Sequence, residues 1–306
     1  MSKPKIVVVG SSNTDMIVKC ESIPAPGETI CGGSFSTAPG GKGANQAVAA
    51  ARAGGDVVFV ARVGDDMLGR QALDGYVRDG IDVSLIRRDP QLSTGVALII
   101  VDKTGNNSIA VASGANAALA STDVVLASEA IKSAQMVVCQ LETPLDAVAR
   151  AAQIAKSAGV PVLLDPAPAP SEPLPQEILE CVTVIKPNEV EATRLTGIEV
   201  TDEASAFKAA EKLLELGVQI AIVTLGSEGS VVVSKTGTRQ RTRAERVEAI
   251  DATAAGDCYS GALAVALAEG RELVDAMTFA SKAAALSVQK LGAQPSLPTR
   301  DEIERA

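Results

Sequence analysis

The stretch Ile6-Val7-Val8-Val9-Gly10-Ser11-Ser12-Asn13-Thr14-Asp15 joins a short, β-rich apolar run to a polar turn. Similar apolar runs recur along the chain and predict buried strands. They lie at 57–60, 136–139, 160–164, 182–185 and 220–225. The Ala- and Leu-rich segments between them that have helical spacing lie at 44–53, 145–157 and 204–216. This alternation predicts an α/β fold, with a mainly parallel sheet and helices on both of its faces.

Two regions, 16–35 and 96–112, depart from this alternation because strand-like pieces meet there without an intervening helix. The second region is typical of a hairpin, with arms at 96–101 and 108–112 around the turn-rich segment 103–107. We expect both regions to form a small β-sheet that acts as a lid beside a pocket. The whole chain, 1–306, is predicted to be one α/β domain carrying this lid.

The chain of 306 residues has a net charge of -9 and contains no histidine. The negative charge and the lack of basic clusters disfavour nucleic acid as a partner. The absence of histidine excludes Ser-His-Asp and Cys-His catalysis and the usual imidazole-ligated zinc sites. A general base must therefore be Asp, Glu, Lys, Tyr or Cys, and magnesium or potassium is favoured over zinc.

Composition also predicts where the protein resides. The apolar stretches are interrupted by Gly, Pro or charge well before membrane-spanning length, so no membrane partner is expected. The short apolar run near the N-terminus does not fit a signal peptide. Five scattered cysteines without a CxxC pair predict reduced, mostly buried thiols. A cytoplasmic location follows.

The strongest local signal is Asp251-Ala252-Thr253-Ala254-Ala255-Gly256-Asp257, which precedes a helix-forming run. Its small residues allow the backbone N–H groups of Ala254, Ala255 and Gly256 to converge on an anion at a helix N-terminus. Asp257, in the first turn, could then accept a proton from a hydroxyl group that attacks this anion. The alternative is that Asp257 is only a favourable partner of the helix dipole.

A second signal is the glycine-rich Pro39-Gly40-Gly41-Lys42-Gly43-Ala44-Asn45-Gln46-Ala47. It is not a Walker loop, because neither Ser nor Thr follows Lys42. It is not a dinucleotide fingerprint either, since Gln46 replaces the third glycine and 37–39 is not strand-like. A tight turn that presents Lys42 and Asn45 to a ligand fits better, and a plain helix-start turn is the alternative.

Polar side chains follow several predicted strands. Ligands of open α/β sheets bind beyond the carboxyl ends of strands, where Asn13, Asp15 and Glu142 could hydrogen-bond a polyol. Asn188 and Glu191 are three positions apart and could share one face of a starting helix, which suits hydrated magnesium. Ordinary turn residues are the alternative for Asn13 and Asp15.

The turn Thr224-Leu225-Gly226-Ser227-Glu228-Gly229 follows the last of the predicted strands. Its glycines would let the backbone approach a nucleotide closely. A simple hairpin turn into the apolar run 231–233 is the alternative.

Taken together, these motifs and their order resemble the PfkB carbohydrate kinase family, from Ile6 to about Pro298. Residues 40–47 look like the first family signature, and 251–257 with the following Gly261-Ala262 look like the second. One departure is Ala252, where the family usually carries a hydroxyl residue or proline. The carboxylates and the anion-hole residues of the signature are all present.

The resemblance implies ATP-dependent phosphorylation of a sugar, with Asp257 removing the proton from a primary hydroxyl group. Ala254, Ala255 and Gly256 would form the anion hole. Ribose is the implied substrate; fructose or another sugar is an alternative, and so is a non-catalytic sugar-binding regulator on the same fold. The implied sugar-binding residues are Asn13, Thr14, Asp15, Gly41, Lys42, Gly43, Ala44, Asn45, Glu142 and Asp257 itself.

The resemblance also implies sites for ATP, Mg²⁺ and K⁺. The ATP set comprises Asn188, Thr224, Leu225, Gly226, Ser227, Glu228, Gly229, Gly256, Asp257 and Ser281. Glu191 would help to place magnesium. The potassium set, mostly through backbone carbonyls, comprises Asp251, Thr253, Ser287, Lys290, Gly292 and Ser296. Open strand edges in the lid predict a homodimer.

Overall fold

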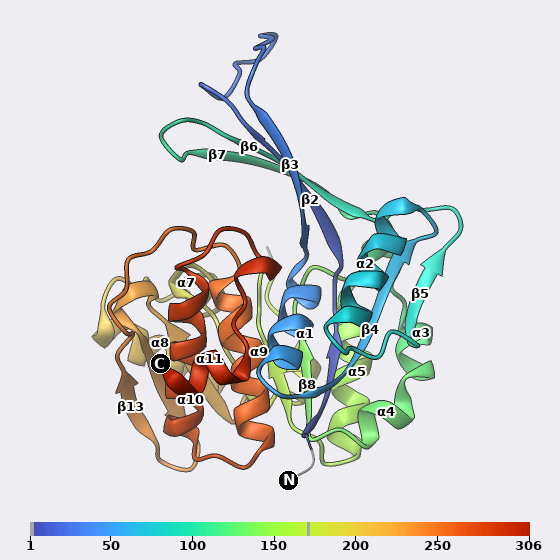
Figure 1. Ribbon diagram of the computed structural model, residues 1–306. Helices are drawn as coiled ribbons and strands as arrows, with labels where there is room; N and C mark the ends of the chain where they lie inside the picture. Colours follow the sequence, from blue (N-terminus) through green and yellow to red (C-terminus); the bar gives the residue numbers. More distant parts are fainter. Residues whose placement is uncertain (1–2, 170–171) are drawn as a thin grey trace.

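The computed structural model describes residues 3–169 and 172–306, and a nine-stranded sheet forms its centre (Figure 1). The strands lie in the order β13-β12-β11-β10-β9-β8-β1-β4-β5. From β11 to β5 every neighbouring pair is parallel, whereas β12 and β13 are antiparallel. The strands are β1 (Lys5–Val9), β4 (Asp56–Gly64), β5 (Ile86–Asp89), β8 (Met136–Cys139), β9 (Val162–Leu164), β10 (Val184–Ile185), β11 (Ile220–Thr224), β12 (Ser230–Ser234) and β13 (Arg239–Thr242). The predicted mainly parallel sheet is confirmed.

Helices cover both faces of this sheet. The α-helices are α1 (Lys42–Arg52), α2 (Met67–Arg78), α3 (Ser121–Leu126), α4 (Ser128–Lys132), α5 (Leu145–Ser157), α6 (Gln176–Leu179), α7 (Glu189–Thr196), α8 (Glu203–Glu215), α9 (Ala255–Ala268), α10 (Leu273–Ser287) and α11 (Arg300–Arg305). The 3₁₀ helices are η1 (Gly114–Ala118), η2 (Gly226–Glu228) and η3 (Gln294–Ser296). Helix α8 is capped at its N-terminus by Asp202, whose side chain accepts a hydrogen bond from the Ser205 N–H group.

The sheet is buried on both faces because successive side chains of a strand point to opposite sides. In β1, Ile6 and Val8 pack in one cluster with residues of α1, α9 and α10. Val7 and Val9 pack in another cluster with residues of α5 and α8. The continuous apolar sequence of β1 is therefore the pattern of a central parallel strand.

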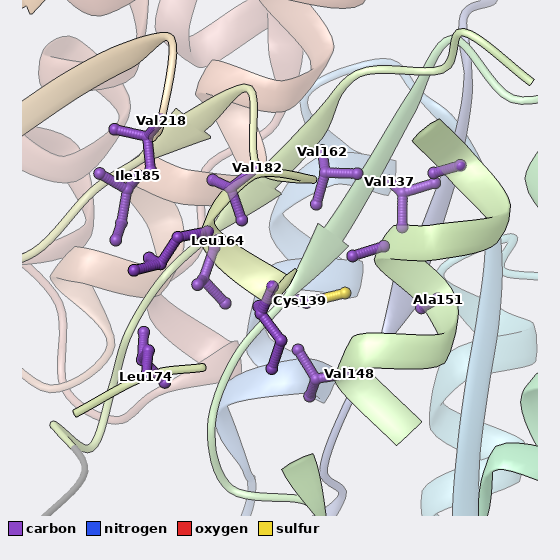
Figure 2. Packing of buried hydrophobic residues seen from close by; sticks show 14 of the residues in the cluster. Val137, Cys139, Val148, Ala151, Val162, Leu164, Leu174, Val182, Ile185 and Val218 are labelled. Atoms are coloured by element: carbon purple, nitrogen blue, oxygen red, sulfur yellow. The ribbon is translucent and has the colours of Figure 1, made fainter. Parts of the chain in front are cut away.

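One of these clusters fixes the ends of three adjacent strands. Figure 2 shows Cys139, Leu164 and Ile185, from β8, β9 and β10, lying on the same side of the sheet as Val148 of α5. All four side chains are fully or almost fully buried, and burial of each of the Leu, Ile and Val side chains contributes about 1.5–3 kcal/mol. The residues that directly follow these strands are thereby held at one edge of the sheet.

The lid is a separate four-stranded sheet of order β3-β2-β6-β7 that rises from the body of the molecule (Figure 1). Its strands are β2 (Asn13–Lys19), β3 (Ser34–Gly40), β6 (Gly95–Val101) and β7 (Asn107–Ala112). The predicted hairpin is confirmed as β6 and β7. The first lid region was predicted at 16–35, but its strands have other bounds. Strand β2 begins earlier, at Asn13, and residues 20–33 form the connection between β2 and β3.

The expectation that 37–39 is not strand-like is wrong, since these residues lie within β3. Pro39 pairs with Thr14 of β2. Proline lacks an N–H group, but β3 is the edge strand of the lid and can tolerate this loss. Asn13 and Asp15 likewise lie on a strand, β2, and not in a turn.

All five cysteines are free thiols, as predicted, but they are not mostly buried. Cys139 and Cys258 are buried, Cys20 and Cys181 are half-buried, and Cys31 is exposed. In the described part of the chain, no helix has both the length and the apolar character needed to cross a membrane.

Candidate active site

The candidate active site lies at the edge of the sheet where β1, β8, β9 and β10 end and where α1 and α9 begin. Helices α1 and α9 pack directly against each other. Gly261 of α9 permits this approach, since a Cβ atom there would lie 2.6 Å from the Ala49 side chain. The first turns of the two helices, which carry the two predicted signatures, therefore meet.

Asp257 lies in the first turn of α9, as predicted, and is 6% exposed. Its Oδ2 accepts a hydrogen bond of 2.9 Å from Asn45 Nδ2, and its Oδ1 accepts one of 3.0 Å from Gln46 Nε2. Burial raises the pKa of Asp257 to about 6, although the nearby Lys42 ammonium opposes this effect. A carboxylate with this pKa is ionised at neutral pH and can still accept a proton readily.

A buried polar cluster behind Asp257 was not assigned a role from the sequence. Gln46 Nε2 also donates to Asp165 Oδ2 at 2.9 Å, and Gln140 Nε2 donates to Gln46 Oε1 at 2.6 Å. Ser260 Oγ donates to the same Asp165 oxygen at 2.8 Å. Asp165 directly follows a buried strand, which is the signal that drew attention to Asn13 and Glu142 and could also have found it.

The backbone before α9 has an unusual conformation. Ala254 has φ = 62°, and it is the one non-glycine residue with positive φ in the described ranges 3–169 and 172–306. Ala255 and Gly256 then begin the helix. The Ala255 N–H group donates to the Ala252 carbonyl at 3.2 Å, a long bond that an anion would have to replace. The three amides predicted for the anion hole are thus adjacent, but one already has an acceptor.

Three predicted sugar-binding carboxylates lie near one another. Glu142 Oε2 accepts hydrogen bonds from Ser11 Oγ at 2.5 Å and from the Lys42 N–H group at 3.0 Å. The pKa of Asp15 is raised to about 6 by burial and then by the charges of Glu142 and Asp257. Burial disfavours the charge of Lys42, but the carboxylates around it outweigh that effect and raise its pKa. Several carboxylates therefore surround the Lys42 ammonium group.

The other predicted sugar-binding residues shape the same region. Gly41 has φ = 89°, and a Cβ atom there would lie only 2.7 Å from the backbone nitrogen of Asn13. Asn13 Oδ1 accepts a hydrogen bond of 2.7 Å from Asn116 Nδ2, a partner that the sequence did not identify. Gly43 and Ala44 donate their N–H groups to Ser11, at 3.2 Å and 2.8 Å, and so hold the turn itself. Thr14 and Asn45 belong to β2 and α1, respectively.

The predicted nucleotide segments are neighbours in the structure. Asn188 caps α7: its Oδ1 accepts from the Glu191 N–H group at 2.8 Å, while Glu191 Oε2 accepts from the Asn188 N–H group at 2.9 Å. Burial and the charge of Asp165 raise the pKa of Glu191. Thr224 pairs with Asn188, and residues 224–229 form the end of β11, η2 and the hairpin turn into β12. Ser281 is buried on α10.

The predicted potassium residues are brought together only in part. Asp251 Oδ1 accepts from the Thr253 N–H and hydroxyl groups, and its Oδ2 accepts from the Gly292 N–H group at 2.8 Å. Lys290 instead extends to Glu302, 3.0 Å away. The hydroxyl groups of Ser287 and Ser296 bond to carbonyls of their own turns, which leaves backbone oxygens as the available ligands.

Comparison with known proteins gives consistent results. A family model described as pfkB family carbohydrate kinase matches residues 3–300. The ribokinase of Haemophilus influenzae is 46% identical to this chain, over 97% of the chain and 96% of the relative. The ribokinase of Staphylococcus aureus is 41% identical, over 98% and 99%. A solved structure of Arabidopsis thaliana ribokinase, complexed with ribose and ATP, has a TM-score of 0.92 at 34% identity and covers 100% of this chain and 98% of its own.

Proposed function

This chain belongs to the pfkB family of carbohydrate kinases, and on that premise we propose that it transfers the γ-phosphoryl group of ATP to the primary hydroxyl of D-ribose. The products are ribose 5-phosphate and ADP. The observation that carries the proposal is the buried Asp257 carboxylate, which Asn45 and Gln46 hold at the start of α9. The ribokinase relatives and the related structure that contains ribose and ATP support ribose as the acceptor.

Asp257 is the general base in this proposal. It takes the proton of the primary hydroxyl as that oxygen forms a bond to the γ-phosphorus, while the bond from phosphorus to the β,γ-bridging oxygen breaks and ADP leaves. The proton then passes from Asp257 to solvent. Phosphoryl transfer depends mainly on alignment and on stabilisation of charge, so fixing both carboxylate oxygens of the base is the appropriate contribution of α1.

Ribose recognition is assigned to the polar groups between the lid and the body. Asn13 and Asp15 on β2, with Lys42 and Glu142 from the body, would hydrogen-bond the sugar hydroxyl groups. Closing the lid over the sugar would exclude water and so limit wasteful ATP hydrolysis. Asn188 and the turn 224–229 are the proposed contacts to ATP, with Ser281 near the adenine.

Magnesium fits the acidic residues on the nucleotide side. Among the described residues, no group of three or more acidic or thiol side chains is arranged to hold a metal ion. Magnesium, however, usually keeps several waters and needs only one or two carboxylates in addition to phosphate oxygens. Glu191 Oε1 is outside the capping bond and is proposed to hold such a hydrated ion. When bound, the ion neutralises phosphate charge.

Potassium fits the segment that precedes the anion hole. Asp251 links its own turn to the loop that contains Gly292, and backbone carbonyl groups of both segments would be the ligands of the cation. Potassium bound there would stabilise the backbone that leads into Ala254. The residues that would hold it are Asp251, Thr253, Ser287, Lys290, Gly292 and Ser296.

We also propose that the chain is one domain with its lid and forms a homodimer through lid strands. The lid edge strand β7 is exposed along its whole length, and this favours pairing with a second copy. A cytoplasmic location without a nucleic-acid or membrane partner stays a prediction from composition.

The test is sugar-dependent release of ADP from ATP, measured with ribose, 2-deoxyribose, fructose, other hexoses and nucleosides. We expect the highest kcat/KM with ribose, and mass spectrometry should identify a pentose monophosphate. A higher kcat/KM with fructose would assign a different acceptor sugar. No ADP release with any sugar, together with measurable sugar binding, would favour the non-catalytic regulator.

A further inference from the structure

Lys186 is a buried lysine to which the mechanism above gives no role. It directly follows β10, and its side chain is only 3% exposed. Its backbone N–H group donates to the Leu164 carbonyl of the adjacent strand β9 at 3.0 Å. The lysine therefore starts from a rigid strand end at the same edge of the sheet as the active site.

The ammonium group of Lys186 lies beside the predicted anion hole. A Cβ atom placed on Gly256 would be 3.6 Å from Lys186 Nζ. Gly256 directly precedes Asp257, so the ammonium is next to the backbone that would receive the phosphoryl group. A positive charge fixed at this point would stabilise charge on the transferring group.

Asp165 holds this ammonium in place. Lys186 Nζ lies 3.2 Å from Asp165 Oδ2, the oxygen that also accepts hydrogen bonds from Gln46 and Ser260. Asp165 Oδ1 has no hydrogen-bond partner among the described residues, although it is buried. The same Gln46 amide joins Asp165 to Asp257, so the ammonium and the base belong to one connected cluster.

A purely structural role explains this arrangement less well. Buried ion pairs contribute little net stability, and apolar residues of similar volume often replace them without loss. Here the pair lies at the start of α9 and not in the centre of an apolar cluster. A positive charge at that place can stabilise a bound phosphate group, whereas it contributes little to the stability of the fold.

We propose that Lys186 is a further catalytic residue, whose ammonium contacts the transferring γ-phosphoryl group of ATP and is positioned by Asp165. This inference rests on the proposed phosphoryl transfer. Lys42 would remain on the sugar side, close to Glu142 and Asp257, while Lys186 acts on the nucleotide side. The charges of both lysines act on Glu191, and Lys186 in addition pairs with Asp165.

The first test is the Lys186→Met variant, which keeps most of the length of the unbranched side chain but removes the ammonium group and its charge. We expect kcat to fall about 10²–10³-fold, as when one oxyanion-hole donor is removed, while KM for ribose changes less than about threefold. The matched control is Lys235→Met, because Lys235 also directly follows a strand but its ammonium donates to the Gly217 carbonyl. This control should retain wild-type kcat.

A double variant separates catalysis from simple charge compensation. Lys186→Met alone leaves the Asp165 carboxylate buried without its cation, whereas Asp165→Asn/Lys186→Met removes both charges. We expect the double variant to recover the Tm lost in Lys186→Met but not its kcat. Recovery of kcat to the level of Asp165→Asn alone would show that Lys186 only neutralises Asp165, and would overturn the proposal.

Ligand binding provides a readout that does not depend on turnover. Calorimetry with ribose present would compare ADP alone with ADP plus aluminium fluoride, which mimics the transferring phosphoryl group. Lys186→Met should weaken the aluminium fluoride complex at least tenfold more than ADP alone, and equal weakening would overturn the proposal. An inactive wild type would overturn the proposed function and this inference together. An active wild type with an unchanged Lys186→Met kcat would overturn the inference alone.

Discussion

Asn45 Nδ2 donates a hydrogen bond of 2.9 Å to Asp257 Oδ2, between residues separated by 212 positions in the sequence. The other end of the same amide is also fixed, because Asn45 Oδ1 accepts a hydrogen bond of 3.3 Å from Gln294 Nε2. The amide of Asn45 therefore cannot rotate without loss of one of these bonds. It fixes the direction in which the Asp257 carboxylate faces the sugar side of the site, and it opposes the pKa rise that burial causes.

Asp257→Asn is expected to bind ribose with near wild-type affinity but to lose about 10²–10⁴-fold in kcat, the usual contribution of a general base. The measurements are steady-state kinetics and ribose binding by calorimetry. The control is Asp275→Asn, because Asp275 is also an acidic residue in the first turn of a helix, α10, but is exposed. Turnover near that of wild type in Asp257→Asn would remove Asp257 from the role of base.

Asp15 should make the free energy of unfolding decrease as pH rises. Its pKa is raised to about 6, first by burial and then by Glu142 and Asp257. The folded chain therefore binds this proton more tightly than the unfolded chain, and the Asp15 carboxyl lowers stability as pH rises from about 4 through 6. We expect Asp15→Asn to be more stable than wild type by about 1–3 kcal/mol at neutral pH, and not at about pH 4.

Thermal unfolding of wild type and Asp15→Asn across this pH range measures the effect. The higher stability of Asp15→Asn should be accompanied by a higher KM for ribose, since this variant loses a proposed sugar contact. Asp146→Asn, at an exposed position in the first turn of α5, should follow the wild-type curve. A Tm difference between Asp15→Asn and wild type that is constant over the whole range would contradict the assignment.

Ala254→Gly should increase stability, because Ala254 has φ = 62° and a left-handed conformation costs a non-glycine residue about 1–2 kcal/mol. The greater freedom of glycine in the unfolded chain offsets part of this gain, so we expect a net increase of about 0.5–1 kcal/mol. Ala255→Gly, at the first position of α9, should instead destabilise, by less than the roughly 0.5–1 kcal/mol that glycine costs in the middle of a helix. Chemical denaturation of both variants gives the comparison, and equal losses would disprove the argument.

The sequence predicted those elements that a local pattern determines. It did not predict elements that depend on their neighbours in the fold. The segment 145–157 was predicted as a helix with the observed bounds of α5, because its apolar spacing is regular. The strand β3 was missed because its residues alternate poorly and include Pro39. Only the position of β3 at the sheet edge, which depends on β2, makes a proline acceptable there.

The candidate site was predicted residue by residue where a motif carried it. Asp257 and Asn45 belong to recognisable signatures, and the structure brings them into contact. Asp165 and Gln140 belong to no such motif, and their importance comes from contacts made between distant segments. The sequence alone predicts the strand end that carries Asp165, but it does not predict that Lys186 pairs with this carboxylate.

Potassium should activate the enzyme, because Asp251 joins the turn before Ala254 to the loop of Gly292. At equal ionic strength, we expect kcat to be at least threefold higher in potassium than in tetramethylammonium chloride. Asp251→Ala should be slow in both salts and lose the difference. Asp202→Ala, which removes a capping carboxylate from α8 instead, should retain the response. Equal rates of wild type in sodium, potassium and tetramethylammonium would exclude the cation site.

The lid strand β7 should form the contact between two copies of the chain. Ile109 and Val111 are 54% and 57% exposed, and they point to the same face of an edge strand whose other edge has no partner in the described residues. Burial of the exposed half of both side chains in both copies would contribute about 3 kcal/mol or more, so Ile109→Lys/Val111→Lys should weaken dimerisation more than a hundredfold. The control is Leu126→Lys, because Leu126 is also an exposed apolar residue, at 66%, but lies on α3.

Analytical ultracentrifugation should show a dimer for wild type and for Leu126→Lys, and a monomer for the lid variant. A wild-type monomer, or a lid variant that stays dimeric, would show that the lid is not the interface.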